Sequence, residues 1–147
     1  MSEFRLHPRL AQDTVVLGDL DLSRVLLSKD SRYPWLILVP KQADISEIHH
    51  LSEQDQLALM RESSAVSSLM EACVSPDKMN VASLGNMVPQ LHLHHVARFK
   101  EDDAWPGPIW GAHPALLYSS ENLVKAAEIW RERLSALAQF APASPDE

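Results

Sequence analysis

The stretch Gln90–Arg98, QLHLHHVAR, places three of the seven histidines within four residues of an otherwise apolar run. Side chains alternate between the two faces of a β-strand, so His92 and His94 would share one face with Gln90 and Arg98. A single buried histidine is most often a core residue with satisfied hydrogen bonds. Burying four polar groups without partners would cost on the order of 1–3 kcal/mol each. The pattern therefore predicts a strand whose polar face lines a cleft.

Two kinds of chemistry are compatible with paired histidines on one strand face. His92 and His94 could bind zinc, iron or copper, but such a site needs a third protein ligand. His113, His49 or His50 could supply it, although no spacing selects one of them. Alternatively, a neutral imidazole could attack a phosphorus or carbonyl centre as a nucleophile. The residue pattern alone does not decide between these interpretations.

The composition of the chain is that of an ordinary globular protein. Its 147 residues are 46% apolar, and a single domain over residues 1–140 is expected. The net charge of −7 argues against a general nucleic-acid-binding surface but leaves room for a local phosphate site. One cysteine excludes an internal disulfide framework. No apolar run reaches the ~18 residues that a membrane span needs. The N-terminus has no signal-peptide layout. A cytoplasmic protein with no membrane partner is the resulting expectation.

Hydrophobic periodicity predicts the order of the first elements. Two strands, Thr14–Leu20 and Ser23–Lys29, would form a hairpin. Trp35–Lys41 is a continuous apolar run and is predicted as a strand buried on both faces. A long helix is expected over Ser52–Val74, with Ser52 as its N-cap, and a further strand over Met79–Gly85.

Towards the C-terminus, a long loop rich in Pro and Gly precedes a last helix. The apolar face of that helix is marked by Leu123, Ala127, Trp130, Leu134 and Leu137. Residues 141–147 are expected to form a frayed, disordered tail. Runs of strands with helices on one side are typical of an α+β fold with an antiparallel sheet.

The segment Lys78–Phe99, KMNVASLGNMVPQLHLHHVARF, resembles the histidine triad (HIT) family, and in particular bacterial HIT-like hydrolases. That family carries a His-φ-His-φ-His-φ-φ motif on a strand, where φ is an apolar residue. Gln90–Val96 matches this motif, with Gln in place of the first histidine. The order of elements also agrees, and Ala104–Gly111, AWPGPIWG, is similar to a Trp-Pro segment that follows the motif in some members. The resemblance spans about 15 to 111.

The resemblance implies an α+β fold in which a long helix packs on an antiparallel sheet and a C-terminal helix follows, usually in a two-fold homodimer. It also implies hydrolysis or transfer of a nucleotidyl group at an α-phosphate. Dinucleoside polyphosphates and nucleoside phosphoramidates are the implied substrate classes. In the inferred mechanism a histidine attacks the α-phosphorus and forms a nucleotidyl-imidazole, which water then hydrolyses, so that no metal or other cofactor is required.

Transferred to this sequence, the family's nucleophile is His92, whose other ring nitrogen should donate to a backbone carbonyl. His94 matches the histidine that hydrogen-bonds near the phosphate and leaving group. Asn86 falls where members hold a phosphate oxygen, and Asp30 lies near the family's ribose-binding residue. Trp105 and Trp110 are candidate walls of a nucleobase pocket, with cover for the sheet edge or a dimer contact as the alternative role. That alternative is the favoured one for Trp110.

Three positions depart from the family pattern. Gln90 cannot titrate, but its amide is expected to orient a cleft histidine, so it joins the catalytic candidates. Trp35 stands where many members have a fourth histidine and is assigned to the core, with stacking on a base as the alternative. His95 should point away from the cleft. Arg98 is expected to form a surface ion pair, and the role of Lys41 is left open.

Two alternatives to a HIT-type hydrolase remain open. A nucleotide-binding or sensing protein with little turnover is compatible with the loss of the first histidine and of the histidine at position 35. A metalloprotein built on His92 and His94 is the less favoured alternative. Turnover of a nucleoside phosphoramidate tests the first alternative, and elemental analysis of the purified protein tests the second.

Overall fold

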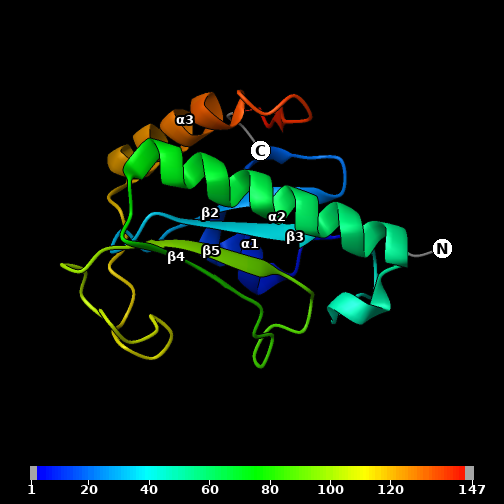
Figure 1. Cartoon of the computed structure of the whole chain (residues 1–147), viewed down its shortest axis with the longest axis horizontal. Coiled ribbons are helices and arrows are strands. Elements are labelled where there is room, and N and C mark those ends of the chain that lie inside the picture. The colour runs from blue at the N-terminus through cyan, green and yellow to red at the C-terminus, as the bar shows by residue number, and fades with distance from the viewer. Residues whose placement is uncertain (1–2, 145–147) are drawn as a thin grey trace.

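Six strands pair into one antiparallel sheet in the computed structural model, which describes residues 3–144 (Figure 1). The order across the sheet is β4-β5-β3-β2-β1-β6. The predicted hairpin is present as the first two strands, and the histidine stretch supplies a strand near one edge. In chain order the strands are β1 (Thr14–Asp19), β2 (Ser23–Ser28), β3 (Trp35–Pro40), β4 (Lys78–Ala82), β5 (Leu93–Arg98) and β6 (Ala141–Pro142).

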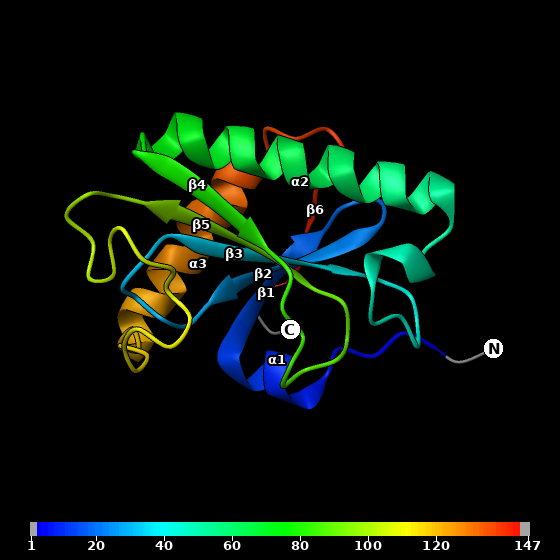
Figure 2. The same cartoon turned by 60° about the horizontal axis from the view of Figure 1, so that its bottom comes forward.

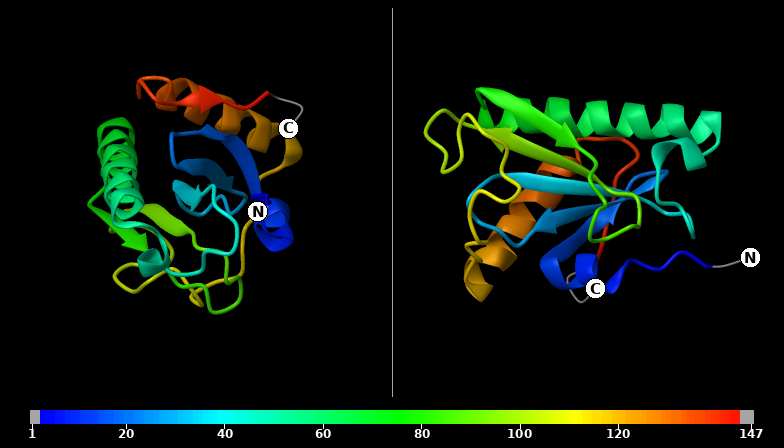
Figure 3. Two further views of the ribbon diagram at one scale, coloured as in Figure 1. Left: turned by 90° about the vertical axis from the view of Figure 1, so that its right-hand side faces the viewer. Right: turned by 90° about the horizontal axis from the view of Figure 1, so that it is seen from below.

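Two helices, α2 (Glu53–Val74) and α3 (Ser120–Leu134), cover one face of the sheet. The short α1 (Pro8–Asp13) lies on the opposite face (Figure 2), and Figure 3 shows the same layers from two further directions. A 3-10 turn, η1 (Ile48–His50), precedes α2. The predicted α+β architecture is confirmed, and α1 is an element that the periodicity did not indicate. None of the helices in residues 3–144 combines the length and apolar character needed to cross a bilayer.

β3 shows how the sheet divides the apolar core. Leu36 and Leu38 point to one face, where they pack with apolar side chains of α2 and α3. Ile37 and Val39 point to the other face and pack with Leu10 of α1. These four strand residues are at most 3% exposed, which confirms that the strand is buried on both faces. The face that carries α1 is also the face that carries the site described below.

The ends of α2 follow from local hydrogen bonding. The Ser52 hydroxyl accepts a hydrogen bond from Asp55 N at 3.1 Å, as expected of an N-cap. At the other end Ser75 adopts a left-handed conformation with φ of 49° and donates its N–H to Glu71 O, which terminates the helix. The predicted boundaries of this helix are therefore confirmed.

The C-terminal segment is ordered over part of the predicted tail. Ala141 and Pro142 form β6 and pair with Asp19 and Gly18 of β1. A Cβ atom at Gly18 would collide with Ala141 O and the Phe140 ring, so the missing side chain permits this close approach. Residues 141–144 therefore do not fit the expectation of a disordered tail, whereas residues 145–147 lie outside the described part of the chain.

His95 projects from β5 towards α2 and is fully buried. Its Nδ1 lies 3.2 Å from Leu93 O and its Nε2 lies 2.8 Å from the Ser63 hydroxyl. Because a carbonyl can only accept, Nδ1 donates, and Nε2 then accepts from Ser63. Burial lowers the pKa of His95 to about 4, against the raising effect of its backbone hydrogen bonds. His95 thus points away from the polar face, as the sequence indicates, and is neutral at pH 7.

Acid should destabilise the protein through His95. Its pKa is near 6.5 in the unfolded chain and about 4 in the folded protein. Between these values the unfolded state binds the proton and the folded state does not. The free energy of unfolding should therefore fall by roughly 3 kcal/mol as the pH decreases across this range. Urea titrations should show a steeper loss for the wild type than for the double variant His95→Leu/Ser63→Ala, and parallel pH dependences would contradict this prediction.

Candidate active site

His92 lies immediately before β5 and is 6% exposed. Its Nδ1 lies 2.7 Å from Gln90 O. Because the carbonyl can only accept, Nδ1 carries the proton and Nε2 keeps its lone pair. Burial lowers the pKa of His92, while the hydrogen bond to Gln90 raises it and the charge of His7 lowers it further. The ring is therefore neutral at pH 7, with Nε2 available for attack or for binding.

His94 lies on β5 and accepts a hydrogen bond through Nδ1, the same ring nitrogen that donates in His92. Trp35 Nε1 lies 3.0 Å from His94 Nδ1. An indole N–H can only donate, so Nδ1 of His94 is unprotonated and the proton of the neutral ring is on Nε2. Burial lowers the pKa of His94 to about 3, and the neighbouring His92 and His95 rings lower it as well. This imidazole is consequently a neutral hydrogen-bond donor.

The two cleft imidazoles are neighbours with complementary capabilities. The ring centroids of His92 and His94 are 4.8 Å apart, and the ring planes meet at 75°. One ring has a lone pair on Nε2 and the other has a proton there. Together they can supply a nucleophile and a hydrogen-bond donor to one substrate group.

Gln90 holds the N-terminal segment with its side chain. The amide oxygen accepts from His7 N at 2.8 Å, and the amide nitrogen donates to Arg5 O at 2.9 Å. The expected contact of this amide with a cleft histidine is therefore not formed, because both ends of the amide bind the N-terminal backbone. Gln90 instead orients His92 through its main-chain carbonyl.

Aromatic side chains connect His94 to a cavity of about 500 Å³. Trp35 and Trp110 both line this cavity, and their ring centroids lie 5.5 and 5.2 Å from that of His94. Asp30 also lines it, and the Asp30 carboxylate accepts two backbone N–H groups at 3.0 and 3.3 Å. The structure thus brings Asp30 and two tryptophans together around a cavity whose tryptophans contact His94, with a volume suited to a small organic ligand.

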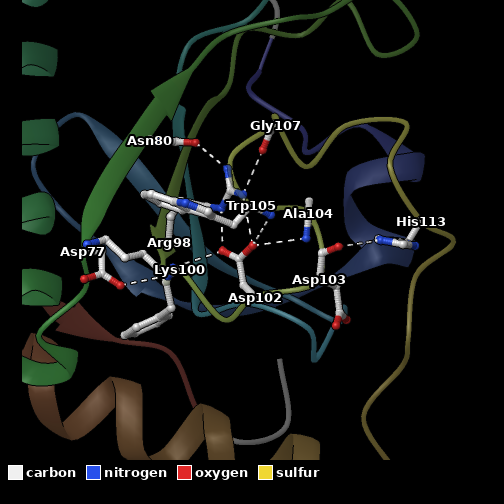
Figure 4. Close-up of polar contacts among 11 residues, drawn as sticks. Asp77, Asn80, Arg98, Lys100, Asp102, Asp103, Ala104, Trp105, Gly107 and His113 are labelled. Carbon is white, nitrogen blue, oxygen red and sulfur yellow. Dashed lines mark hydrogen bonds and ion pairs between the residues drawn. The ribbon is translucent and has the colours of Figure 1, made fainter.

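Arg98 is 1% exposed, so the expected surface ion pair is wrong. Its guanidinium donates to both carboxylate oxygens of Asp102, at 2.7 and 3.1 Å, and also reaches Asn80 Oδ1 and Gly107 O at 2.8 Å each (Figure 4). Burial raises the pKa of Asp102, but Arg98 and three loop N–H groups outweigh it and lower the pKa to about 2. The pair fixes the path of the loop that follows β5.

Trp105 does not line the cavity that Trp110 lines. The Trp105 ring packs against Arg98, with the guanidinium carbon 5.7 Å from the ring centroid. Trp105 therefore does not line this cavity as a nucleobase pocket would require. Instead, it packs on Arg98 beneath the loop and supports it. Trp110, for which cover of the sheet edge or a dimer contact was the favoured role, lines the cavity instead.

Two further candidates lie outside the cavity walls. Asn86 is exposed on the connection between β4 and β5, next to Gly85, whose φ is 80°. Lys41 Nζ donates to Leu20 O at 3.0 Å and lies 3.5 Å from an Asp19 carboxylate oxygen. These contacts give Lys41 a structural partner on the hairpin.

The arrangement of metal-binding side chains bears on the metalloprotein alternative. Within residues 3–144, no group of three His, Cys, Asp or Glu side chains is placed to hold a metal ion. His49 and His50 are exposed and contact each other, with ring centroids 4.7 Å apart. His113 Nε2 lies 2.8 Å from Asp103 O. The described residues therefore offer no third ligand to His92 and His94.

Comparison with known proteins identifies the class to which this fold and site belong. The HIT domain model matches residues 9–101. The chain is similar to a histidine triad protein from Marinobacter aquaeolei VT8, with 48% identity, a TM-score of 0.88 and coverage of 92% of this chain and 99% of that chain. A histidine triad protein from Bradyrhizobium japonicum gives 44% identity, a TM-score of 0.85 and coverage of 90% and 98%. A histidine triad protein from Sinorhizobium meliloti 1021 gives 38% identity and a TM-score of 0.83, with coverage of 90% of this chain and 96% of that chain.

The chain belongs to the histidine triad family. A search of curated proteins gave no significant match. Family membership indicates nucleotide binding, and members are generally nucleotide hydrolases or transferases.

Sequence reasoning missed several residues that shape the site. The core was the favoured place for Trp35, and its hydrogen bond to His94 was not foreseen. Cover was the favoured role for Trp110, which lines the cavity. His7 is the N-cap of α1, and its Nδ1 accepts a hydrogen bond from Arg9 N at 3.1 Å. The one signal for this role in the sequence is Pro8, which stands at the first helical position. The other contacts join distant segments and leave no local pattern.

Removal of Arg98 should destabilise the protein strongly. Arg98→Leu leaves the Asp102 carboxylate buried without its partner, so the free energy of unfolding should fall by on the order of 3–5 kcal/mol. Lys125→Ala is the control, because its ion pair with Glu121 is exposed, and its cost should stay within about 0.5 kcal/mol. Urea unfolding measures the free energy of unfolding of both variants. Similar losses for the two would contradict the prediction that the buried pair stabilises the protein more than the exposed pair does.

Proposed function

We propose that this protein hydrolyses or transfers nucleotidyl groups at an α-phosphate, with His92 as the covalent nucleophile. The observation that carries the proposal is the 2.7 Å hydrogen bond from His92 Nδ1 to Gln90 O. It leaves Nε2 with a free lone pair beside the N–H of His94. Because burial lowers the pKa of His92, the nucleophile is unprotonated at neutral pH without assistance from another base.

The reaction consists of two displacements. In the first, Nε2 of His92 bonds to the α-phosphorus while the bond to the leaving group breaks, and the leaving group keeps the bonding electrons and takes up a proton from solvent. In the second, a water oxygen attacks phosphorus, the P–N bond breaks, and its electron pair returns to Nε2. The water releases one proton to solvent, so the net products are a nucleoside monophosphate and the protonated leaving group. Dividing one difficult displacement into two is the gain of covalent catalysis.

Hydrogen-bond donors around the phosphate stabilise the negative charge that develops on it. His94 donates from Nε2 as a neutral group, since its pKa is about 3. Asn86, on the connection that leads to His92, supplies a side-chain amide to a phosphate oxygen. Gln90 contributes through its backbone carbonyl, which keeps His92 in the reactive tautomer.

The nucleoside part of the substrate occupies the cavity of about 500 Å³. Trp35 and Trp110 provide aromatic surface for the base, and the Asp30 carboxylate accepts hydrogen bonds from ribose hydroxyls. Trp105 acts indirectly, because it packs on Arg98 and so supports the loop that carries Trp110. Dinucleoside polyphosphates and nucleoside phosphoramidates are the proposed substrate classes.

A nucleotide-binding protein with little turnover is the second candidate. The Gln90 amide favours it, because that amide is held by Arg5 and His7 and cannot carry a proton to a leaving group. An assay with a nucleoside phosphoramidate distinguishes the two candidates. Release of nucleoside monophosphate indicates an enzyme, whereas affinity without product indicates a binding protein.

His92→Ala should abolish turnover of a nucleoside phosphoramidate. Loss of a covalent nucleophile should lower kcat/KM by at least about three orders of magnitude. His49→Ala is the matched control, because His49 is exposed in η1 and should leave the rate unchanged. Circular dichroism melts establish that both variants fold, and near-wild-type activity in folded His92→Ala would contradict the mechanism.

We also propose that the chain forms a two-fold homodimer through α2 and β4. Leu57 and Met60 of α2 are 54% and 63% exposed, and Val81 of β4 is 48% exposed. β4 is an edge strand of the sheet, with backbone groups available to a second chain. An exposed apolar surface beside an open edge is suited to a self-complementary contact. The loop tryptophans, in contrast, pack against Arg98 and His94 of their own chain.

Light scattering should give twice the chain mass of 16.5 kDa. The double variant Met60→Glu/Val81→Glu should be monomeric, because it places charges in the proposed apolar contact. Ile129→Glu, on the exposed side of α3, is the control and should remain dimeric. A wild-type mass of 16.5 kDa across micromolar concentrations would reject the dimer.

A further inference from the structure

The indole of Trp35 makes its polar contact with an imidazole of the site. Trp35 begins β3, and the antiparallel pairing with β5 places Trp35 opposite Val96 and Ile37 opposite His94. Trp35 and His94 are therefore diagonal neighbours on one face of the sheet, within reach of a large side chain. The distance from Trp35 Nε1 to His94 Nδ1 is 3.0 Å, and the two ring planes are inclined at 55°.

We propose that Trp35 is a positioning residue that holds His94 as the Nε2–H tautomer. Trp35 can do this because the indole has one polar hydrogen and no acceptor, so His94 Nδ1 has to be the acceptor. The proton of the imidazole is then confined to Nε2, on the far side of the ring from the indole. A 180° turn of the ring would replace this nitrogen by a carbon and lose the hydrogen bond.

Packing and burial strengthen the same constraint. The Trp110 ring lies edge-on to Trp35 with centroids 6.4 Å apart, and its centroid is 5.2 Å from that of His94. His94 is 7% exposed, so water offers little competition for Nδ1. The low pKa of His94, about 3, keeps one proton on the ring at neutral pH. That proton can be on Nδ1 or on Nε2, and the hydrogen bond from the indole N–H to Nδ1 places it on Nε2.

Trp35 also connects the two halves of the proposed substrate site. Its ring lines the cavity of about 500 Å³, while its N–H binds the imidazole next to His92. A nucleoside in the cavity therefore contacts the residue that orients the phosphate donor. This role in catalysis rests on the proposed function, whereas the tautomer of His94 does not depend on it.

Nitrogen-15 NMR of the full chain, labelled at histidine, measures the tautomers directly. At pH 7 the wild type should show His94 with protonated Nε2 and bare Nδ1, and His92 with the reverse pattern. Signals are assigned by their loss in His94→Gln and His92→Gln. A protonated Nδ1 on His94 in the wild type would overturn the proposal, and this result does not depend on whether any Trp35 variant folds.

Trp35→Phe keeps an aromatic ring but removes the N–H. The His94 pattern should shift towards a mixture of tautomers, while the His92 pattern stays as in the wild type and reports an intact site. Trp110→Phe is the matched control, because its Nε1 has no hydrogen-bond partner within the described chain and its loss should leave the His94 tautomer unchanged. An unchanged His94 pattern in Trp35→Phe, or equal changes in both variants, would overturn the proposal.

Kinetics adds a second readout. If a phosphoramidate is turned over, kcat of Trp35→Phe should fall on the order of tenfold with a smaller change in KM, because the donor acts mainly on the charged transition state. Absence of turnover in the wild type together with the expected tautomers would refute the proposed enzyme and leave the role of Trp35 in place. Expected tautomers with unchanged kcat in Trp35→Phe would refute its catalytic importance.

Discussion

The position of β5 between β3 and β4 forces its side chains to alternate between two packed faces. His95 and Ala97 face α2 and the larger core, whereas His94 and Arg98 face the opposite side. A slip of one residue would exchange the two sets, placing Arg98 in the apolar core and His95 in the cleft. The register of this single strand therefore determines both the packing of α2 and the composition of the site.

Hydrogen-bond partners distinguish two imidazoles that are otherwise alike. His92 and His94 are both buried, and burial lowers the pKa of each. The acceptor at Gln90 O places a proton on Nδ1 of one ring, while the donor of Trp35 excludes it from Nδ1 of the other. A fixed difference between neighbouring rings allows the site to present a lone pair on one Nε2 and a proton on the other without changing protonation state. In the proposed mechanism a main-chain carbonyl orients His92, and Gln90 supplies that carbonyl whatever its side chain is.

Features encoded by local periodicity could be predicted, and contacts between distant segments could not. The order of the elements along the chain, the long helix and the shared face of His92 and His94 follow from spacing along the chain. The Gln90 amide meets an N-terminal segment that has no periodic signal, so its partners were not foreseen. The direction of the Trp35 N–H depends on the register between β3 and β5. The exclusion of Trp105 from the cavity depends on a loop path that is set by a buried arginine.

The proposed covalent step at His92 can be tested most directly by trapping the intermediate. The protein is mixed rapidly with a nucleoside phosphoramidate and quenched in alkali, which preserves a phosphorus–nitrogen bond. The digest is then mapped by mass spectrometry. A nucleotidyl group on the peptide containing His92, formed at least as fast as the steady-state turnover, is the predicted result. Turnover without an adduct on His92, or an adduct on another residue, would contradict the mechanism.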